Sequence, residues 1–165
     1  MRSIKDRPVL ISSSLGSLAG ILIWSAACLS DRKHLTCEEV RSAETSADID
    51  KCQAFYTVLT LLWRAESSNG KQMIGDGGLA RGHFQQHEGH WHDGCERLGA
   101  DWAYPKDTHN LAKAAAVTAA NWARYAPDAL KSGNVEMLVR QHRKPNDPYG
   151  SGQDEYLDRV MKGIK

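Results

Sequence analysis

Hydrophobic residues recur at helical spacing in a long segment that begins near Ser46 or Asp48, either of which is an acceptable N-cap. The segment continues to about Ser67, where Asn69 and Gly70 stop it. Four of its side chains fall at positions i, i+4, i+7 and i+11, which is one face of a helix: Phe55, Leu59, Leu62 and Glu66. The pattern therefore predicts an amphipathic helix whose apolar face ends in a glutamate.

Glycine dominates the stretch that follows this helix. Five glycines lie between residues 70 and 82, three of them around Asp76. This composition is typical of turns and of a short hairpin rather than of a helix. Residues 84–98 are expected to be helical only in part, because Gly89 and Gly94 weaken the pattern.

Three more helices are predicted in the C-terminal half. The first covers about 109–126 and ends near Pro127, the second covers about 134–143 with Asn134 as its N-cap, and the third opens at Ser151 with a weak capping box. The third helix is expected to bury four apolar side chains: Leu157, Val160, Met161 and Ile164. The chain is therefore predicted to be mainly α, with a small glycine-rich β or loop insert after the first helix.

The N-terminus has the order of a secretory signal. Three basic residues lie among the first seven, an apolar stretch runs to Trp24, and small residues at 25–27 precede Cys28. The apolar part is short for a membrane-spanning helix, which needs roughly 20 residues. Cys28 could be lipidated as in bacterial lipoproteins, although Ser25 stands where such sites usually have Leu; plain cleavage and an uncleaved anchor are the alternatives.

The chain is accordingly divided into three parts. Residues 1–27 are a signal peptide or N-terminal anchor, 28–46 a polar linker, and 47–165 one globular domain. The protein is expected to be exported, and to be periplasmic, attached to the envelope or secreted.

Charge and cysteine content narrow the picture further. The net charge of +1 offers no basic face, so no nucleic-acid partner is expected. Cys37 and Cys52 could close a small loop, which would stabilise the fold by about 3 kcal/mol. Cys95 would then be left over, unless Cys28 stays in the protein and pairs with it, and the sequence leaves the connectivity open.

Glu66 is anomalous on the apolar face of the first helix, because glutamate is almost never buried unless it is paired or functional. Desolvation beside Leu62 and Trp63 and the C-terminal end of the helix dipole both disfavour the charged form, so we expect a raised pKa. A carboxylic acid that stays protonated near neutral pH is what a glycosidase needs to protonate the leaving oxygen. The alternative is a solvated residue in the frayed last turn, or one paired with Arg64 or Arg81.

Asp76 supplies a second carboxylate ten residues further on. Backbone amides of the glycine-rich turn could keep it ionised. One protonated carboxyl near one charged carboxyl is the pattern that separates an acid from a base or nucleophile. The alternative is an ordinary turn aspartate, since Asp-Gly is common turn chemistry.

A dense run of metal-ligand residue types follows: His83, His87, His90, His92, Asp93 and Cys95. Imidazole suits zinc and copper, but the spacing matches no closed site. We therefore expect no metal and no other cofactor, and histidines that line a polar cleft or the surface. Three tryptophans could stack on sugar rings or belong to the core, the core being favoured for Trp122: Trp91, Trp102 and Trp122.

Three motifs in this order resemble the lysozyme-like superfamily: Glu-Ser-Ser-Asn-Gly at 66–70, the glycine-rich 75–78, and Arg-Gly-His-Phe-Gln at 81–85. The superfamily includes the lytic transglycosylases, whose pattern is Glu-Ser, a glycine-rich stretch and Gly-x-x-Gln. The chain looks closer to the invertebrate-type lysozymes, the destabilase family, in which Gly-x-Phe-Gln-Ile precedes Tyr-Trp-x-Asp-Cys. In this chain His-Trp-His-Asp-Gly-Cys stands at 90–95.

Three later segments extend the resemblance. Residues 121–125 are similar to the mid-chain helix of that family, 139–142 to its Ala-Arg-x-His-Asn-Gly-Gly-Pro motif, and 156–160 to its closing Tyr-Trp-x-x-Val. The resemblance covers about residues 55–162. It implies a lysozyme-like α+β fold and cleavage of the β-1,4 bond between N-acetylmuramic acid and N-acetylglucosamine.

The resemblance also implies roles for particular residues. It places the general acid at Glu66 and the second carboxylate at Asp76, and it implies that four residues bind substrate: Ser67, Gln85, His142 and Tyr156. The chain departs from the family at Gln86, where Ile is preferred, and at 143–146, where Arg-Lys-Pro-Asn replaces Asn-Gly-Gly-Pro. Most of the family's disulfides are absent as well.

The expectation is therefore a monomeric, exported glycosidase whose partner is peptidoglycan or a related glycan, with the N-terminus as a means of membrane attachment. Hydrolysis would use Glu66 together with Asp76. Lytic transglycosylation would use Glu66 alone, first as acid and then as base, and would close a 1,6-anhydro ring without water. The rival is a non-catalytic glycan-binding or envelope-structural protein on the same fold, which the altered loop at 143–148 supports.

Overall fold

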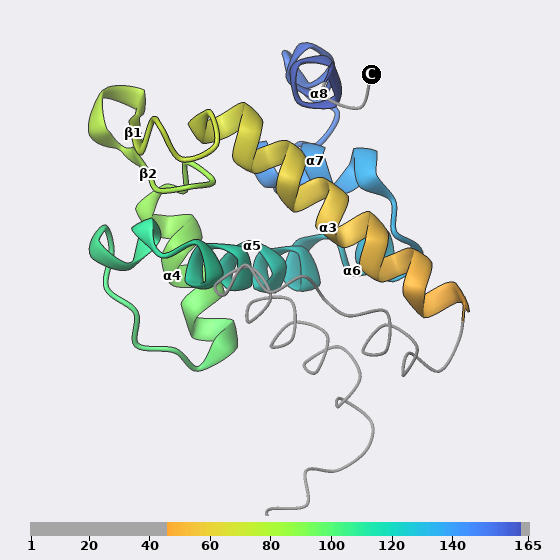
Figure 1. The fold of residues 1–165 in the computed structure, drawn as a ribbon, viewed down its shortest axis with the longest axis horizontal. Coiled ribbons are helices and arrows are strands. Elements are labelled where there is room, and N and C mark those ends of the chain that lie inside the picture. Colours follow the sequence, from red (N-terminus) through yellow and green to blue (C-terminus); the bar gives the residue numbers. More distant parts are fainter. Residues whose placement is uncertain (1–45, 163–165) are drawn as a thin grey trace, which may run out of the picture.

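The computed structural model describes residues 46–162 and is mainly helical, as the sequence pattern predicts (Figure 1). Its elements are α3 (Ser46–Ser67), β1 (Ile74–Gly75), η1 (Asp76–Gly78), β2 (Ala80–Arg81), α4 (Glu88–Leu98), η2 (Lys106–His109), α5 (Leu111–Tyr125), α6 (Pro127–Ser132), α7 (Val135–Arg143) and α8 (Gln153–Met161). The predicted signal or anchor at 1–27, all but the last residue of the linker at 28–46, and with them Cys28 and Cys37, lie outside the described residues. Within 46–162 no helix is both long enough and apolar enough to cross a membrane.

Helix α5 lies at the centre of the fold. Nine consecutive residues, 114–122, are buried, which is the pattern of a helix covered on all sides. Helix α4 packs along it, and η2, α6 and α7 also contact it. Trp122 belongs to this core, which confirms the core interpretation of that residue. Trp91 is equally buried, so neither ring can stack on a sugar.

Gly94 explains how closely α4 and α5 approach. A Cβ at this position would lie 2.7 Å from Cγ1 of Val117 and 2.8 Å from its carbonyl oxygen. Glycine in a helix costs about 1 kcal/mol relative to alanine, and here the close packing of the two helices offsets that cost. Helix α4 therefore runs through both Gly89 and Gly94, although the sequence pattern treated them as weak points.

Helix α3 crosses the molecule and packs against α6, α7 and α8 (Figure 1). Three of its predicted face residues are buried: Phe55, Leu59 and Leu62. Val58 and Leu61 are buried too, because elements cover more than one face of the helix. This packing fixes the C-terminal end of α3, where Glu66 lies.

The glycine-rich stretch forms the predicted small insert. Strands β1 and β2 pair antiparallel, with Ile74 opposite Arg81 and Gly75 opposite Ala80. Gly82 follows β2 with φ +76°, and a Cβ there would lie 2.7 Å from the carbonyl carbon of Thr108. Only glycine allows this close approach of the insert to η2.

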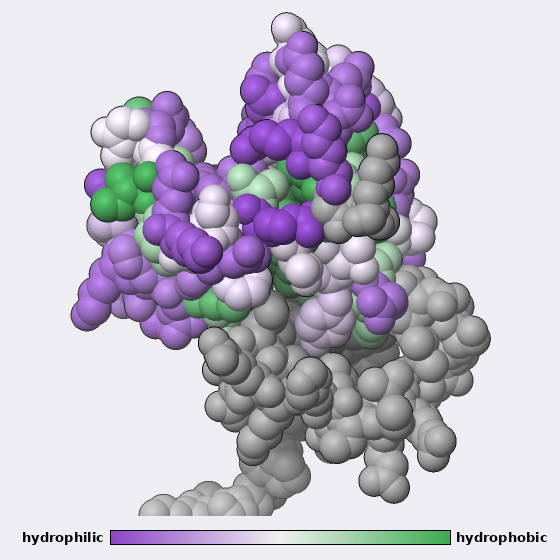
Figure 2. All heavy atoms as spheres, turned by 45° about the horizontal axis from the view of Figure 1, so that its top comes forward, coloured by the Kyte–Doolittle hydropathy of each residue, from purple (hydrophilic) through white to green (hydrophobic). Residues whose placement is uncertain are grey.

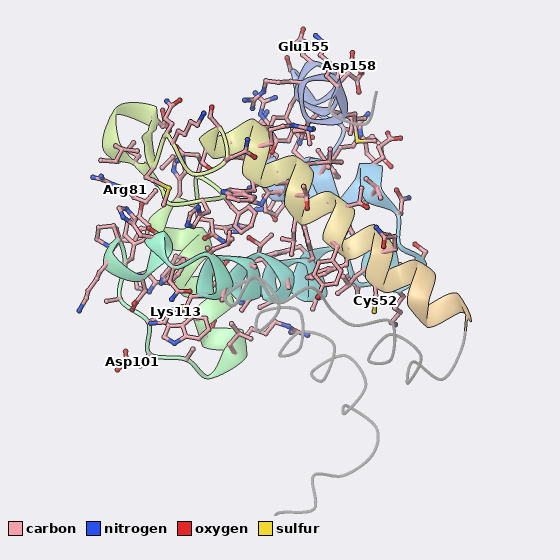
Figure 3. The ribbon with its side chains drawn as sticks, in the orientation of Figure 1. Cys52, Arg81, Asp101, Lys113, Glu155 and Asp158 are labelled. Atoms are coloured by element: carbon pink, nitrogen blue, oxygen red, sulfur yellow. The ribbon has the colours of Figure 1, made fainter. Side chains whose placement is uncertain are left out.

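Helix α5 ends at Tyr125, just before Pro127, as predicted. Pro127 then begins α6, a helix that the sequence pattern did not predict, since proline is favoured at the first helical position. Helix α8 is capped by the backbone of Gly152, in the left-handed conformation, and the capping box at Ser151 does not form. Its buried residues are Gln153, Tyr156 and Val160, whereas Leu157 and Met161 are partly buried and Ile164 lies outside the described residues. Glu155 and Asp158 lie on the outer side of α8, away from α3 (Figure 3).

Candidate functional site

A cavity of about 600 Å³ lies where the end of α3, the insert, α4, the loop after α7 and α8 meet. Figure 2 shows the surface hollowed between the insert and α8, with hydrophilic side chains on both sides of the hollow. Polar residues supply nearly the whole wall: Glu66, Asp76, Ala80, Gln85, Gln86, His87, His90, Asp93, Tyr125, His142, Arg143, Pro145, Asn146, Tyr156 and Arg159. Five of the six residues expected to act on substrate are thus brought together, namely Glu66, Asp76, Gln85, His142 and Tyr156.

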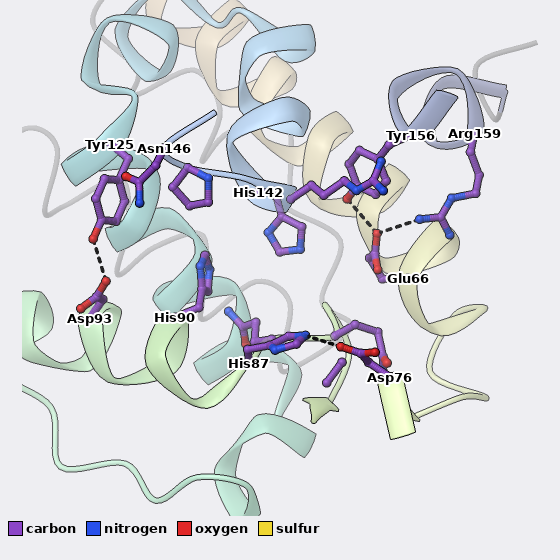
Figure 4. Close-up of a pocket in the computed structure, with 15 residues that line it drawn as sticks. Glu66, Asp76, His87, His90, Asp93, Tyr125, His142, Asn146, Tyr156 and Arg159 are labelled. Carbon is purple, nitrogen blue, oxygen red and sulfur yellow. Dashed lines mark hydrogen bonds and ion pairs between the residues drawn. The ribbon is translucent and has the colours of Figure 1, made fainter. Parts of the chain in front are cut away.

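Glu66 lies in the last turn of α3, and its side chain is 14% exposed. Tyr156 donates a hydrogen bond of 2.7 Å to its Oε1, and Nη2 of Arg159 lies 3.5 Å from the same oxygen (Figure 4). Glu66 is therefore largely enclosed, as expected, but it also has an arginine partner. That partner is Arg159, from the far end of the chain.

Tyr156 fixes the position of this carboxyl group. Burial, together with the nearby Glu66 carboxylate, raises the pKa of its phenol well above the usual value. The hydroxyl therefore keeps its proton over the whole physiological range and remains a hydrogen-bond donor to Glu66. Because both contacts of Glu66 are made by Oε1, Oε2 is the oxygen that can act on a ligand in the cavity.

Asp76 reaches the cavity from the turn of the insert. Its φ of +50° is unusual for a residue other than glycine, and such strain often marks functional positions. The exposed carboxylate lies 3.3 Å from Nε2 of His87, the residue that precedes α4. Within the described residues no backbone amide donates to it, so the expected amide cradle is wrong and the histidine takes its place.

Gln85 forms part of the wall between the insert and α3. Its side-chain amide donates to the carbonyl oxygens of Gln72 (3.1 Å) and Gly82 (2.9 Å). A Cβ at Gly75 would collide with the amide oxygen of Gln85, so a larger residue there would require this side chain to shift. The neighbouring Gln86 is buried and donates to Oγ1 of Thr118 (2.9 Å), which anchors this segment to α5.

Two neutral histidines lie in the middle of the cavity wall. The rings of His90 and His142 meet edge to face with centroids 5.6 Å apart. Nε2 of His142 lies 2.9 Å from the carbonyl oxygen of Phe84 and so carries the proton, which makes the buried Nδ1 an acceptor. Burial lowers the pKa of His142, and burial together with the nearby His142 lowers the pKa of His90 to about 3. Within residues 46–162, neither Nε2 of His90 nor Nδ1 of His142 has a hydrogen-bond partner.

Ser67 does not reach the cavity, which overturns the substrate-binding role implied for it. The residue is fully buried. Its hydroxyl donates to the carbonyl oxygen of Trp63 (2.9 Å) and accepts from the amide of Gly70 (3.0 Å). Ser67 therefore forms hydrogen bonds to backbone groups at the C-terminal end of α3 and helps to cap this helix.

Of the four histidines between residues 83 and 92, two line the cavity and two lie outside it. His87 and His90 line the cavity, whereas His83 packs against Trp63 and His92 lies beside Glu88 on the surface. Over the described part of the chain no three His, Cys, Asp or Glu side chains are grouped so as to hold a metal ion.

The residues that line the end of the cavity away from Glu66 were not predicted from the sequence to bind substrate. There Tyr125 donates a hydrogen bond of 2.6 Å to Asp93, and this bond raises the pKa of the tyrosine. Asn146 lies beside the pair (Figure 4). Arg159 could have been anticipated, because it follows Tyr156 by three residues and thus shares its helix face.

Fold and site together define a mainly helical protein with a polar cavity that holds three carboxyl groups, each on a separate element. Comparison of the chain with models of known families finds no match, and neither curated proteins nor solved structures give one. The activity therefore has to be inferred from the chemistry of the cavity.

Proposed function

We propose that this chain is a glycosidase on a lysozyme-like fold that cleaves the β-1,4 bond between N-acetylmuramic acid and N-acetylglucosamine in peptidoglycan. The observation that carries the proposal is the position of Glu66. Its carboxyl group lies at the end of a core helix, is largely enclosed by protein, and forms part of the wall of a polar cavity. A volume of about 600 Å³ is that of a pocket for a small ligand, large enough for sugar rings. The order of a glutamate-ending helix and a glycine-rich insert further supports the lysozyme-like assignment.

Glu66 would act as the general acid. A general acid must come within about 3 Å of the atom that it protonates, and Oε2 is the oxygen of Glu66 not engaged by Tyr156 or Arg159. The proton would pass from Oε2 to the glycosidic oxygen as the bond to the anomeric carbon breaks. The sugar ring then resembles an oxocarbenium ion and carries positive charge, which a second carboxylate stabilises.

Asp76 is the candidate for that second group. It stands on the insert, and with His87 it could stabilise the sugar cation or position a water molecule. Without such help Glu66 would act as acid and then as base, and the sugar's own hydroxyl would close a 1,6-anhydro ring. Hydrolysis and lytic transglycosylation share the same first step.

The test is turnover of purified peptidoglycan by the wild type and by Glu66→Gln. The amide keeps the shape of the side chain but cannot donate an acidic proton, so we expect the rate to fall by about 1,000-fold or more. Glu96→Gln is a matched control, because Glu96 is an exposed glutamate outside the cavity. Equal rates for the wild type and Glu66→Gln would remove Glu66 from the mechanism.

The masses of the released muropeptides would then assign the reaction, because an anhydro product is lighter than the hydrolysis product by one water. The altered loop at 143–148, of which Arg143, Pro145 and Asn146 line the cavity, favours one rival: a glycan-binding or envelope-structural protein without turnover. That rival would be supported if the wild type bound glycan strands tightly and released no fragment from them.

A further inference from the structure

Two arginines border the cavity next to Glu66. Arg143 is the last residue of α7, Arg159 lies on α8, and both line the cavity. Each guanidinium carbon lies 5.1 Å from the centre of the Tyr156 ring. The tyrosine that holds the proposed acid therefore also holds two cations beside it.

These guanidinium groups are anchored mainly by uncharged partners. Arg143 donates to the carbonyl oxygen of Gly152, and Nη1 of Arg159 donates to that of Ala65 at 3.2 Å. A carbonyl oxygen and an aromatic face fix the direction of a guanidinium but leave its charge in place. Arg140 is different, because Glu136 (3.0 Å) and Asp154 (2.6 Å) neutralise it in the interior.

The charge beside Glu66 is therefore positive. In the described part of the chain no carboxylate lies within ion-pair distance of Arg143, and Arg159 meets only Glu66. When Glu66 carries the proton that it is proposed to transfer, neither arginine has an anionic partner. The other carboxylates of the cavity lie elsewhere, Asp76 against His87 and Asp93 against Tyr125.

We propose that Arg143 and Arg159 form an anion subsite that binds a carboxylate of the substrate close to the bond that is cut. This inference rests on the proposed function and names the feature by which the site selects its glycan. The planar guanidinium fork matches a carboxylate, and anchoring in advance lowers the entropy lost on binding. In peptidoglycan such a carboxylate belongs to the lactyl group of muramic acid, where no peptide is attached, or to the stem peptide.

Binding to the inactive Glu66→Gln protein separates recognition from turnover. Three probes are compared by calorimetry: neutral N-acetylglucosamine oligomers, glycan strands freed of their peptides, and strands with intact stems. The carboxylate-bearing strands should bind about tenfold or more tightly than the neutral oligomers, with a preference that fades at high salt. A preference for peptide-free strands would identify the lactyl carboxylate, and a preference for intact strands the stem.

Arg143→Gln, added to Glu66→Gln, should remove most of this preference and leave binding of the neutral oligomers unchanged. Arg143→Lys should retain part of it, and Arg159→Gln gives a second variant should the first fold poorly. Arg97→Gln is the matched control, since Arg97 is an exposed arginine on α4 outside the cavity. Equal weakening of all three probes, or no weakening, would overturn the subsite. Failure of the wild type to cut peptidoglycan with the preference intact would instead count against the proposed activity alone.

Discussion

Tyr156 donates a hydrogen bond of 2.7 Å to Oε1 of Glu66, although 90 residues separate the two in sequence. The bond joins the first and the last described helices, because α8 packs against α7 and α3. Tyr156 is only 4% exposed, so the surrounding side chains hold its ring, and with it the hydroxyl group, in one position. The proposed acid therefore owes its orientation to the C-terminal helix.

Tyr156→Phe should lower the turnover number of the proposed reaction by about 10- to 100-fold. The substitution removes one hydrogen bond to a charged or protonated carboxyl, an interaction worth about 1.5–3 kcal/mol, and keeps the ring that packs between the helices. Tyr149→Phe is the control, because Tyr149 is an exposed tyrosine outside the cavity wall. Steady-state kinetics on purified peptidoglycan would show the effect, and an unchanged turnover number for Tyr156→Phe would mean that Glu66 needs no such orientation.

Asp76 and His87 should act as one unit in the proposed reaction. Asp76→Asn and His87→Gln are each expected to lower kcat/KM by about 10-fold or more, and the double variant should lose little beyond the worse single one. The exposed pair Glu88 and His92, 3.6 Å apart on α4, offers a matched control that should change nothing. Additive losses would show that the contact between Asp76 and His87 has no catalytic importance.

Gly82→Ala should destabilise the fold by about 2–4 kcal/mol, because the new methyl group meets η2 while the backbone stays at positive φ. Gly89→Ala is the control: nothing lies within 4 Å of a Cβ there, and alanine in a helix should stabilise it by up to about 1 kcal/mol. Urea unfolding measures both changes. A neutral Gly82→Ala would show that the insert can move away from Thr108.

Local signals in the sequence predict most of the helices. Asn134 illustrates this, since its side chain accepts from the amide of Met137 as an N-cap should. Helix α6 was missed because a proline is compatible both with the end of one helix and with the start of the next. Here Pro127 does both: α5 ends just before it, and α6 begins with it and packs against α3 and α5.

The site was predictable only where one residue stands out from its neighbours. Glu66 interrupts an apolar face, and Asp76 interrupts a run of glycines, so both could be singled out. Ser67 stands next to Glu66 in sequence but points into the end of α3. The partners that hold Glu66 come from α8, and no pattern local to α3 specifies a contact across 90 residues.

His90 should make the fold sensitive to acid. Burial lowers its pKa in the folded protein to about 3, whereas the unfolded chain has the ordinary value of 6.5. Between these two values the unfolded chain binds a proton that the folded one does not, so the contribution of His90 is complete above pH 6.5 and is lost as the pH falls toward 3. Between pH 7 and pH 5 the loss should be on the order of 2 kcal/mol.

His90→Gln removes this titration, so its free energy of unfolding should change less between pH 7 and pH 5 than that of the wild type. His92→Gln is the control, because His92 lies two residues away on the outer surface of α4 beside Glu88. This variant should keep the wild-type dependence of stability on pH. Urea unfolding at a series of pH values gives both curves. Parallel curves for the wild type and His90→Gln would mean that water reaches the imidazole in the folded state and that the ring is protonated there as readily as in the unfolded chain.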